Sequence, residues 1–310
     1  MPPGFTCKEF ILNEFDTYSV FVALVGRPNV GKSSLTNRLV GEKVAIVTSK
    51  PQTTRTRITG VVTRGPIQYV LLDTPGVHPA RTKLGSRMDK TASDSLGDVD
   101  VTLMLFEPYG ELNESEMGLI RALKGSPAIA IINKTDTLRS PADLEARRAQ
   151  LEALGVFSQV RAISVKADEG CEELFDQLAQ YKVEGPHYFP EDAYTDLPEK
   201  VLVSEIIREK ALLNLRDEIP HGIAVTVERF KERPDKNILD IDVNIYCERK
   251  SHKGMVIGKG GAMLKKIASQ ARIECESFLD AKVNLQCWVK VKEDWRDSDF
   301  LLNDFGFTKP

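Results

Sequence analysis

The chain has few cysteines and no long apolar run, and these two absences exclude several classes of protein. Its five cysteines show no CxxC spacing, so we expect neither a zinc ribbon nor a disulfide framework. This cysteine usage fits a protein of a reduced compartment. No apolar stretch approaches the roughly 18 residues that a membrane-spanning helix needs. Residues 1–18 carry a single lysine, Lys8, ahead of acidic residues, which is not typical of a leader peptide. We therefore expect a cytoplasmic protein.

Strong net charge is also absent. The 310 residues carry a formal net charge of only −3, so the overall charge does not indicate a nucleic-acid binder. The length is sufficient for two domains. Any indication of function must therefore come from local motifs.

The most informative motif is Gly-Arg-Pro-Asn-Val-Gly-Lys-Ser at residues 26–33, which follows an apolar strand expected over 20–25 and precedes a helix. This is the pattern of a phosphate-binding loop, whose glycines let consecutive backbone N–H groups turn toward a phosphate. Lys32 is expected to reach the β- and γ-phosphates, and the hydroxyl of Ser33 to bind Mg²⁺. The alternative is an ordinary glycine-rich turn, which the position between a strand and a helix disfavours.

Two further motifs each follow an apolar strand. Asp73-Thr74-Pro75-Gly76 follows residues 67–72, and we expect Asp73 to hold Mg²⁺ through water and the Gly76 N–H to meet a γ-phosphate. Asn133-Lys134-Thr135-Asp136 follows residues 128–132. One carboxylate at Asp136 can accept hydrogen bonds from both N1–H and the exocyclic amine of guanine, whereas adenine offers neither donor.

The neighbours of Asp136 are expected to support guanine binding. Asn133 would brace adjacent loops, and the stem of Lys134 would lie along the base plane. Ser164-Val165-Lys166, after a fifth short strand, can offer backbone donors to the guanine carbonyl. A polar turn after a strand is the alternative for each segment alone. Together the segments predict a guanine-nucleotide site.

In this order the four segments resemble the G domain of translation-factor-type GTPases. Residues 51–55, Pro-Gln-Thr-Thr-Arg, resemble more narrowly the switch I motif of the bacterial Era family of GTPases. The resemblance implies that a threonine of this motif closes over Mg²⁺ and the γ-phosphate in the triphosphate state. We assign this role to Thr54, with Thr53 as the competitor.

The chain departs from Ras-like GTPases after Gly76. The next residue is Val77, which cannot orient a hydrolytic water as a glutamine does, so we expect slow intrinsic hydrolysis. His78 is interpreted as a loop histidine and is left outside the catalytic set. Asn29 has two open interpretations: it caps a turn, or it resembles the position that holds K⁺ beside the nucleotide in related GTPases.

A second region of interest is residues 249–273, which contain seven Lys or Arg and no Asp or Glu. A basic run is often only a solvated helix face. Here it surrounds Gly258-Lys259-Gly260-Gly261, a GxxG loop expected between two helices. The loop resembles that of a KH domain, in which glycines permit close approach of a nucleic-acid backbone and an apolar groove takes unstacked bases.

The order of elements expected from residue 199 onward supports this interpretation. It is a helix (201–215), two strands (223–228 and 239–246), a short helix, the GxxG loop, a long helix (262–279) and a strand (283–290), which resembles a type II KH domain. Residues 205–210, 218–221 and 293–296 are also similar to the C-terminal part of the Era family. The predicted fold is therefore an α/β P-loop G domain, with a mostly parallel sheet and helices on both faces, followed by an α+β type II KH domain.

We expect the G domain at residues 1–183, a linker with two prolines and a glycine at 184–198, and the KH domain at 199–310. The resemblance implies a GTPase that uses GTP and Mg²⁺, with K⁺ as a further candidate, and binds single-stranded RNA. The implied partners are the 3′ end of 16S ribosomal RNA and the 30S subunit, with no DNA. The basic run also leaves open a peripheral position at the inner face of the cell membrane.

Two other functions stay open. One is an RNA-binding scaffold whose nucleotide domain has little turnover, which the absence of a glutamine after Gly76 permits. The other is a P-loop phosphotransferase, against which the guanine-reading Asp136 argues.

The candidate residues form four sets. The catalytic set is Thr54, Asp73 and Gly76. The metal-binding set is Ser33, Thr54 and Asp73. The nucleotide-binding set is Gly26, Asn29, Val30, Gly31, Lys32, Ser33, Ser34, Asn133, Lys134, Asp136, Ser164, Val165 and Lys166. The RNA-binding set is Lys253, Val256, Ile257, Gly258, Lys259, Gly260, Gly261, Lys265 and Lys266.

Overall fold

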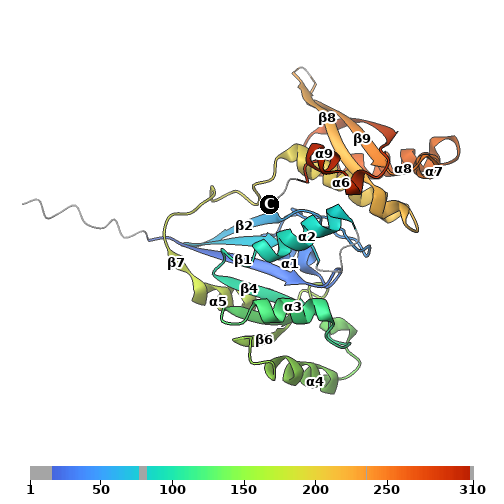
Figure 1. Cartoon of the computed structure of the whole chain (residues 1–310). Helices are drawn as coiled ribbons and strands as arrows, with labels where there is room; N and C mark the ends of the chain where they lie inside the picture. Colours follow the sequence, from blue (N-terminus) through green and yellow to red (C-terminus); the bar gives the residue numbers. More distant parts are fainter. Residues whose placement is uncertain (1–15, 77–81, 235, 308–310) are drawn as a thin grey trace, which may run out of the picture.

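The apolar runs of the first half of the chain form one central β-sheet (Figure 1). In this computed structural model, which describes residues 16–76, 82–234 and 236–307, the strand order is β2-β3-β1-β4-β5-β6, with β7 paired to β1. The strands are β1 (Tyr18–Gly26), β2 (Ile58–Arg64), β3 (Ile67–Asp73), β4 (Val101–Phe106), β5 (Ala128–Ile132), β6 (Gln159–Ala162) and β7 (Val183–Glu184). The pairs β1–β3, β1–β4, β4–β5 and β5–β6 are parallel, whereas β2–β3 and β1–β7 are antiparallel.

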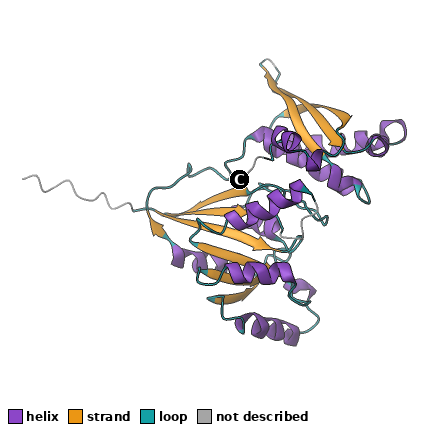
Figure 2. Ribbon diagram, in the orientation of Figure 1, coloured by secondary structure: helices purple, strands orange, loops and turns teal. Residues whose placement is uncertain are grey.

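Helices cover both faces of this sheet (Figure 2), which is why β4 and β5 are buried along their whole length. Alternate residues of β4 enter two different cores: Leu103 and Leu105 pack on one face, and Met104 and Phe106 on the other. The helices are α1 (Lys32–Val40), α2 (Lys83–Asp94), α3 (Glu114–Ala122), α4 (Pro141–Glu152) and α5 (Glu173–Leu178), with short 3₁₀ turns at Thr135–Thr137 and Ala179–Tyr181. The architecture confirms the predicted P-loop α/β fold.

The second half of the chain forms a smaller three-stranded sheet. Its strand order is β10-β9-β8, in which β8–β9 is antiparallel and β9–β10 is parallel. The elements are α6 (Glu199–Asn214), β8 (Ala224–Arg233), β9 (Ile238–Cys247), α7 (Lys250–Ile257), α8 (Ala262–Leu279), β10 (Lys282–Val291) and α9 (Asp299–Asp304), with 3₁₀ turns at Ile219–Gly222, Lys259–Gly261 and Trp295–Asp297. This order, from α6 to β10, is the one expected for the KH domain.

The segment that connects the halves is hydrogen-bonded to the large sheet. The side chain of Gln68 on β3 accepts from the N–H groups of Tyr188 and Phe189 at 2.8 and 3.0 Å and donates to the Phe189 carbonyl at 2.9 Å. Further along, Thr195 forms a β-bridge with Gly60 on β2. The connecting segment is therefore bonded to two strands of the large sheet before α6 begins.

The two halves share an apolar contact. Leu84 and Met88 of α2 pack in one cluster with Tyr246 of β9, Trp295 and Leu302 of α9. Both halves thus contribute buried side chains to a common core.

None of the described helices combines the length and the apolar character that a bilayer crossing requires.

Candidate functional site

The parallel strands of the large sheet bring the predicted nucleotide motifs to one edge. In a parallel sheet the carboxyl ends of neighbouring strands lie on the same side. Residues 26–33 follow β1, residues 73–76 follow β3, residues 133–136 follow β5 and residues 164–166 follow β6. Four segments far apart in the sequence are therefore neighbours at this edge.

The phosphate-binding loop has the backbone that its glycines predict. Gly26 and Gly31 have φ angles of 141° and 107°, and Asn29 has a φ of 62°. A Cβ on Gly31 would lie 2.2 Å from Nδ2 of Asn133, and one on Gly26 would lie 2.6 Å from the carbonyl oxygen of Leu105. Both conformation and space therefore require glycine at these positions.

Lys32 is held inside this loop. Its side chain is 5% exposed, and its Nζ donates to the carbonyl oxygens of Gly26 and Arg27 at 3.1 and 2.9 Å. Burial lowers the pKa of Lys32 to about 8, although the neighbouring Asp73 carboxylate opposes that shift. The site thus holds a cation that a phosphate would stabilise.

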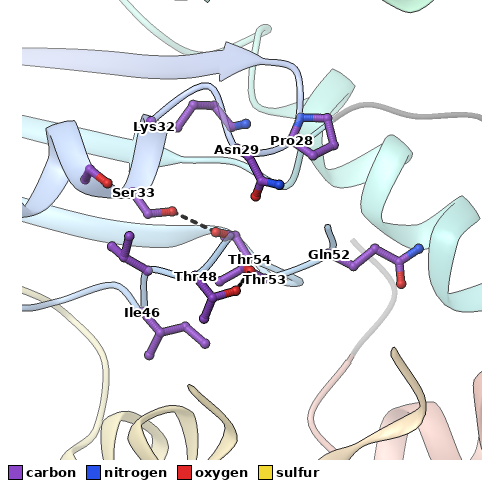
Figure 3. Close-up of a pocket in the computed structure, with 12 residues that line it drawn as sticks. Pro28, Asn29, Lys32, Ser33, Ile46, Thr48, Gln52, Thr53 and Thr54 are labelled. Atoms are coloured by element: carbon purple, nitrogen blue, oxygen red, sulfur yellow. Dashed lines mark hydrogen bonds between the residues drawn. The ribbon is translucent and has the colours of Figure 1, made fainter. Parts of the chain in front are cut away.

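Ser33 and Thr54 face each other beside the loop (Figure 3), and Asp73 bonds to the same Ser33 hydroxyl. The Ser33 hydroxyl donates to Oδ2 of Asp73 at 2.6 Å and lies 2.8 Å from Oγ1 of Thr54. Asp73 is fully buried, and its Oδ1 accepts no hydrogen bond from the residues that the structure describes. Burial raises the pKa of Asp73 to about 6, against the opposing effects of Lys32 and of the hydrogen bond from Ser33. Two hydroxyls and a carboxylate with a free oxygen fit a hard divalent cation.

The two threonines of the switch I motif face different partners. Thr54 lies against Ser33, whereas Oγ1 of Thr53 donates to the Lys50 carbonyl and lies 2.7 Å from the hydroxyl of Thr48. Thr48, Thr53 and Thr54 also line a cavity of about 80 Å³ between the phosphate-binding loop and the segment 46–55, which we call the switch I segment. This placement favours Thr54 for the metal role.

Asn29 bridges the two sides of the cavity, since its Nδ2 donates to the Ser49 carbonyl at 2.7 Å.

The residues expected to bind guanine form a connected network. Asn133 is 2% exposed, donates to the Val30 carbonyl at 2.8 Å, and accepts from the N–H of Val165 at 3.3 Å. The hydroxyl of Ser164 donates to Oδ1 of Asp136 at 2.8 Å. The bracing role predicted for Asn133 is therefore visible in its contacts, and Ser164 orients Asp136, a role that sequence reasoning did not identify.

The two lysines of this region reach outward. Nζ of Lys134 lies 2.6 Å from a Glu107 carboxylate oxygen, and Lys134 has a positive φ of 64°. Lys166 is 88% exposed in its side chain and lies 3.9 Å from Asp136. The side chain of Lys134 therefore ends in an ion pair with Glu107, whereas that of Lys166 is open to solvent.

Gly76 packs directly against the phosphate-binding loop. A Cβ at this position would lie 2.6 Å from the backbone nitrogen of Pro28, which no side chain permits. A glycine is therefore needed for the close approach of the two loops. Val77 and His78, on which the expectations about slow hydrolysis rest, lie outside the described residues.

The RNA-binding candidates lie in the other half, between α7 and α8. Gly258, Gly260 and Gly261 have φ angles of 75°, 58° and 80°. A Cβ on Gly258 would lie 2.8 Å from the backbone nitrogen of Met263, whereas Gly260 and Gly261 have no other atom within 4 Å of that position. The loop is therefore fixed at its first glycine and open at its last two.

The side chains around this loop divide into two groups. Lys253, Lys259, Lys265 and Lys266 lie on the surface and can meet phosphates. Val256 requires a correction: it is fully buried in the core of this half, so it supports the loop from beneath and cannot contact RNA.

Sequence reasoning also missed a set of buried charges between the switch I segment and the second half. Arg55 and Arg208 are 4% and 1% exposed, and Glu209 is 3% exposed. Each bonds to a residue of the other half. The only sequence signal was their place inside segments 51–55 and 205–210, which had been noted for their resemblance alone.

The comparisons with known proteins agree with this geometry. Residues 21–134 match the family described as 50S ribosome-binding GTPase, and residues 218–296 match the family described as KH domain. The chain is 46% identical over 292 residues to the GTPase Era of Clostridium novyi (strain NT), covering 93% of this chain and 98% of that protein.

Two solved structures are similar over nearly the whole chain. A single-residue variant of Aquifex aeolicus Era bound to GDP·AlF₄⁻ has a TM-score of 0.90 and 35% identity, covering 94% of this chain and 100% of that chain. A complex of Era with MgGDPNP and nucleotides 1506–1542 of 16S ribosomal RNA has a TM-score of 0.90 and 34% identity, covering 94% of this chain and 99% of that chain.

The shifted pKa values predict a bell-shaped pH dependence of kcat/KM for GTP. Below about pH 6 the Asp73 carboxylate takes up a proton and loses its capacity to bind a cation, and above about pH 8 Lys32 loses its charge. Steady-state turnover measured from pH 5 to 9 tests this. The Lys32→Arg variant is the control, because arginine stays charged and the alkaline fall in kcat/KM should disappear. A flat profile in the unmodified protein would contradict the assignment.

Removing the guanine-reading carboxylate should lower affinity for GTP selectively. Asp136→Asn replaces an acceptor for two guanine donors, and we expect a loss of GTP affinity of at least about 100-fold with no change for ATP. Titration with fluorescent GTP and ATP analogues measures both. The matched control is Glu145→Gln, whose carboxylate is 70% exposed on α4. An equal loss for both nucleotides would point to a structural defect instead.

Proposed function

Because the chain belongs to the Era family of GTPases, we propose that its GTP cycle controls a KH domain that holds the 3′ end of 16S ribosomal RNA. The chain is a GTPase with a G domain and a KH domain. The observation that carries the proposal is the open GxxG loop with its surface lysines, in a chain whose relative was solved with nucleotides 1506–1542 of that RNA. We infer a role as a switch in assembly of the 30S subunit, in the cytoplasm.

In the proposed site each residue has a physical task. The loop N–H groups and Lys32 bind the phosphates, and Asp136 selects guanine. Ser33, Thr54 and Asp73 would hold Mg²⁺, which neutralises charge that develops on the phosphate oxygens. Gly76 lies beside the phosphate-binding loop, where its N–H can meet a γ-phosphate. Intrinsic turnover is slow in this proposal, because Val77 cannot orient water.

The RNA-binding half can be tested by one substitution that the structure shows to be tolerable. Gly260→Asp places a carboxylate on an open position with a φ of 58°, which aspartate adopts more readily than most residues. It should weaken RNA binding through repulsion of phosphates, while GTP affinity stays unchanged.

The experiment measures GTP turnover with and without an oligonucleotide that copies the 3′ end of 16S ribosomal RNA. We expect stimulation by this sequence, none by a scrambled one, and at least about tenfold weaker RNA binding in Gly260→Asp. Gly65→Asp is the matched control, since Gly65 has a φ of 56° and open space but lies between β2 and β3. Turnover indifferent to every RNA would remove the proposal. Binding of the same variants to anionic vesicles tests the peripheral membrane alternative.

We also propose K⁺ as a second cation beside the nucleotide, held by the side-chain oxygen of Asn29. Its Nδ2 is already used by the Ser49 carbonyl, which leaves Oδ1 as an acceptor. Turnover should be several-fold faster in KCl than in NaCl, and Asn29→Gly, which suits the φ of 62°, should abolish the difference. Equal rates in both salts would leave Asn29 as a turn residue.

A further inference from the structure

The switch I segment is held as much by the KH half as by its own half. Two of its backbone groups bond to consecutive residues of α6: the Val47 N–H donates to Glu209 at 2.9 Å, and the Thr53 carbonyl accepts from Arg208. Val47 and Thr53 both line the cavity next to the phosphate-binding loop. Helix α6 therefore shapes one wall of the nucleotide site from outside the G domain.

Arg208 has few ways to leave this position. Its side chain is 1% exposed and its Nε donates to Glu205 at 2.7 Å, while its Nη2 donates to Glu205 and to the Thr53 carbonyl. A guanidinium keeps its charge at all relevant pH values, so burial is costly when an acceptor is lost. The docked arginine thus favours the position of Thr53 seen in this structure.

Glu209 fixes the start of the same segment. Besides the Val47 N–H, its carboxylate accepts from Nζ of Lys43 and of Lys210, each at 2.7 Å. Burial would raise the pKa of Glu209, but these three hydrogen bonds outweigh it and the pKa lies below its ordinary value. The buried carboxylate therefore stays ionised at neutral pH and keeps its hold on Val47.

The contact is reciprocal, because Arg55 of the switch I segment enters the KH half. Its Nη1 and Nη2 donate to the carbonyls of Ile223 and His221 at 2.6 and 2.9 Å. Its guanidinium also lies 5.6 Å from the centre of the Trp295 ring. Thr54 is thus flanked on both sides by residues bonded to the other half, while its own hydroxyl faces Ser33.

We propose that Arg208 and Glu209 are positioning residues for GTP hydrolysis: by holding Thr53 and Val47 from the KH half, they keep Thr54 at the metal-binding site. The KH half therefore completes the triphosphate form of the G domain in cis. The inference rests on the proposed role of Thr54. The proposal predicts different effects on GTP and GDP binding, since a segment that closes over a γ-phosphate contributes to binding of GTP and not of GDP.

The experiment compares Arg208→Ala and Glu209→Ala in the full chain. Arg208→Ala removes the donor to the Thr53 carbonyl, and Glu209→Ala removes the acceptor for the Val47 N–H. We expect affinity for a non-hydrolysable GTP analogue and kcat to fall about tenfold in both variants, with GDP affinity unchanged. The control is Arg272→Ala, which removes an exposed pair with Glu276 on α8.

Two results would overturn the inference. Unchanged discrimination between the GTP analogue and GDP in both alanine variants would show that α6 does not act on the site, and an equal loss for both nucleotides would show a purely structural role. Thr54→Ala in the same assay separates the premise from the inference. If Thr54→Ala lowers discrimination and Arg208→Ala does not, only the inference fails. If Thr54→Ala has no effect, the proposed role of Thr54 fails with it.

Discussion

The parallel alignment of β1, β3, β4 and β5 is the constraint on which the nucleotide site depends. It places the ends of strands that are remote in sequence at one edge, so that Asn133 reaches the loop beside Gly31 and Asp73 reaches Ser33. The approach is so close that a single methyl group on Gly31 would displace Asn133. Register matters for the same reason, since a shift by one residue would turn alternate side chains of β4 into the wrong core.

That edge also concentrates charge away from water. Burial disfavours the ionised forms of both Lys32 and Asp73, which partly stabilise each other across the site. A ligand that brings anionic phosphates to Lys32 and a cation to Asp73 restores the interactions that burial removed. Burial is thus the main cause of both pKa shifts, and Oδ1 of Asp73 accepts no hydrogen bond from the described residues.

The sequence predicted the parts of the structure that are encoded locally. The motifs after β1, β3 and β5, the GxxG loop and the order of elements from α6 to β10 are each written in consecutive residues with a defined period or turn chemistry. Contacts between distant segments have no such local pattern in the sequence. Val256 was placed among the RNA contacts because it lies next to the GxxG loop, whereas packing with the strands beneath decides its burial. No local pattern indicates that Arg55 and Arg208 are buried against backbone carbonyls of the other half.

The interface between the halves combines two kinds of contact, one made by the switch I segment and one made by α2. The contact of the switch I segment uses charged groups bonded to its backbone, so it is lost whenever that backbone moves. The contact of α2 combines apolar packing of Leu84 and Met88 against Trp295 and Leu302 with hydrogen bonds from Lys83 and Arg87 to Asp297, Asp299 and Asn303. Helix α2 lies outside the switch I segment, so this second contact does not depend on the backbone of residues 46–55. Movement of the switch I backbone would therefore break the first contact and leave the KH half attached through the second.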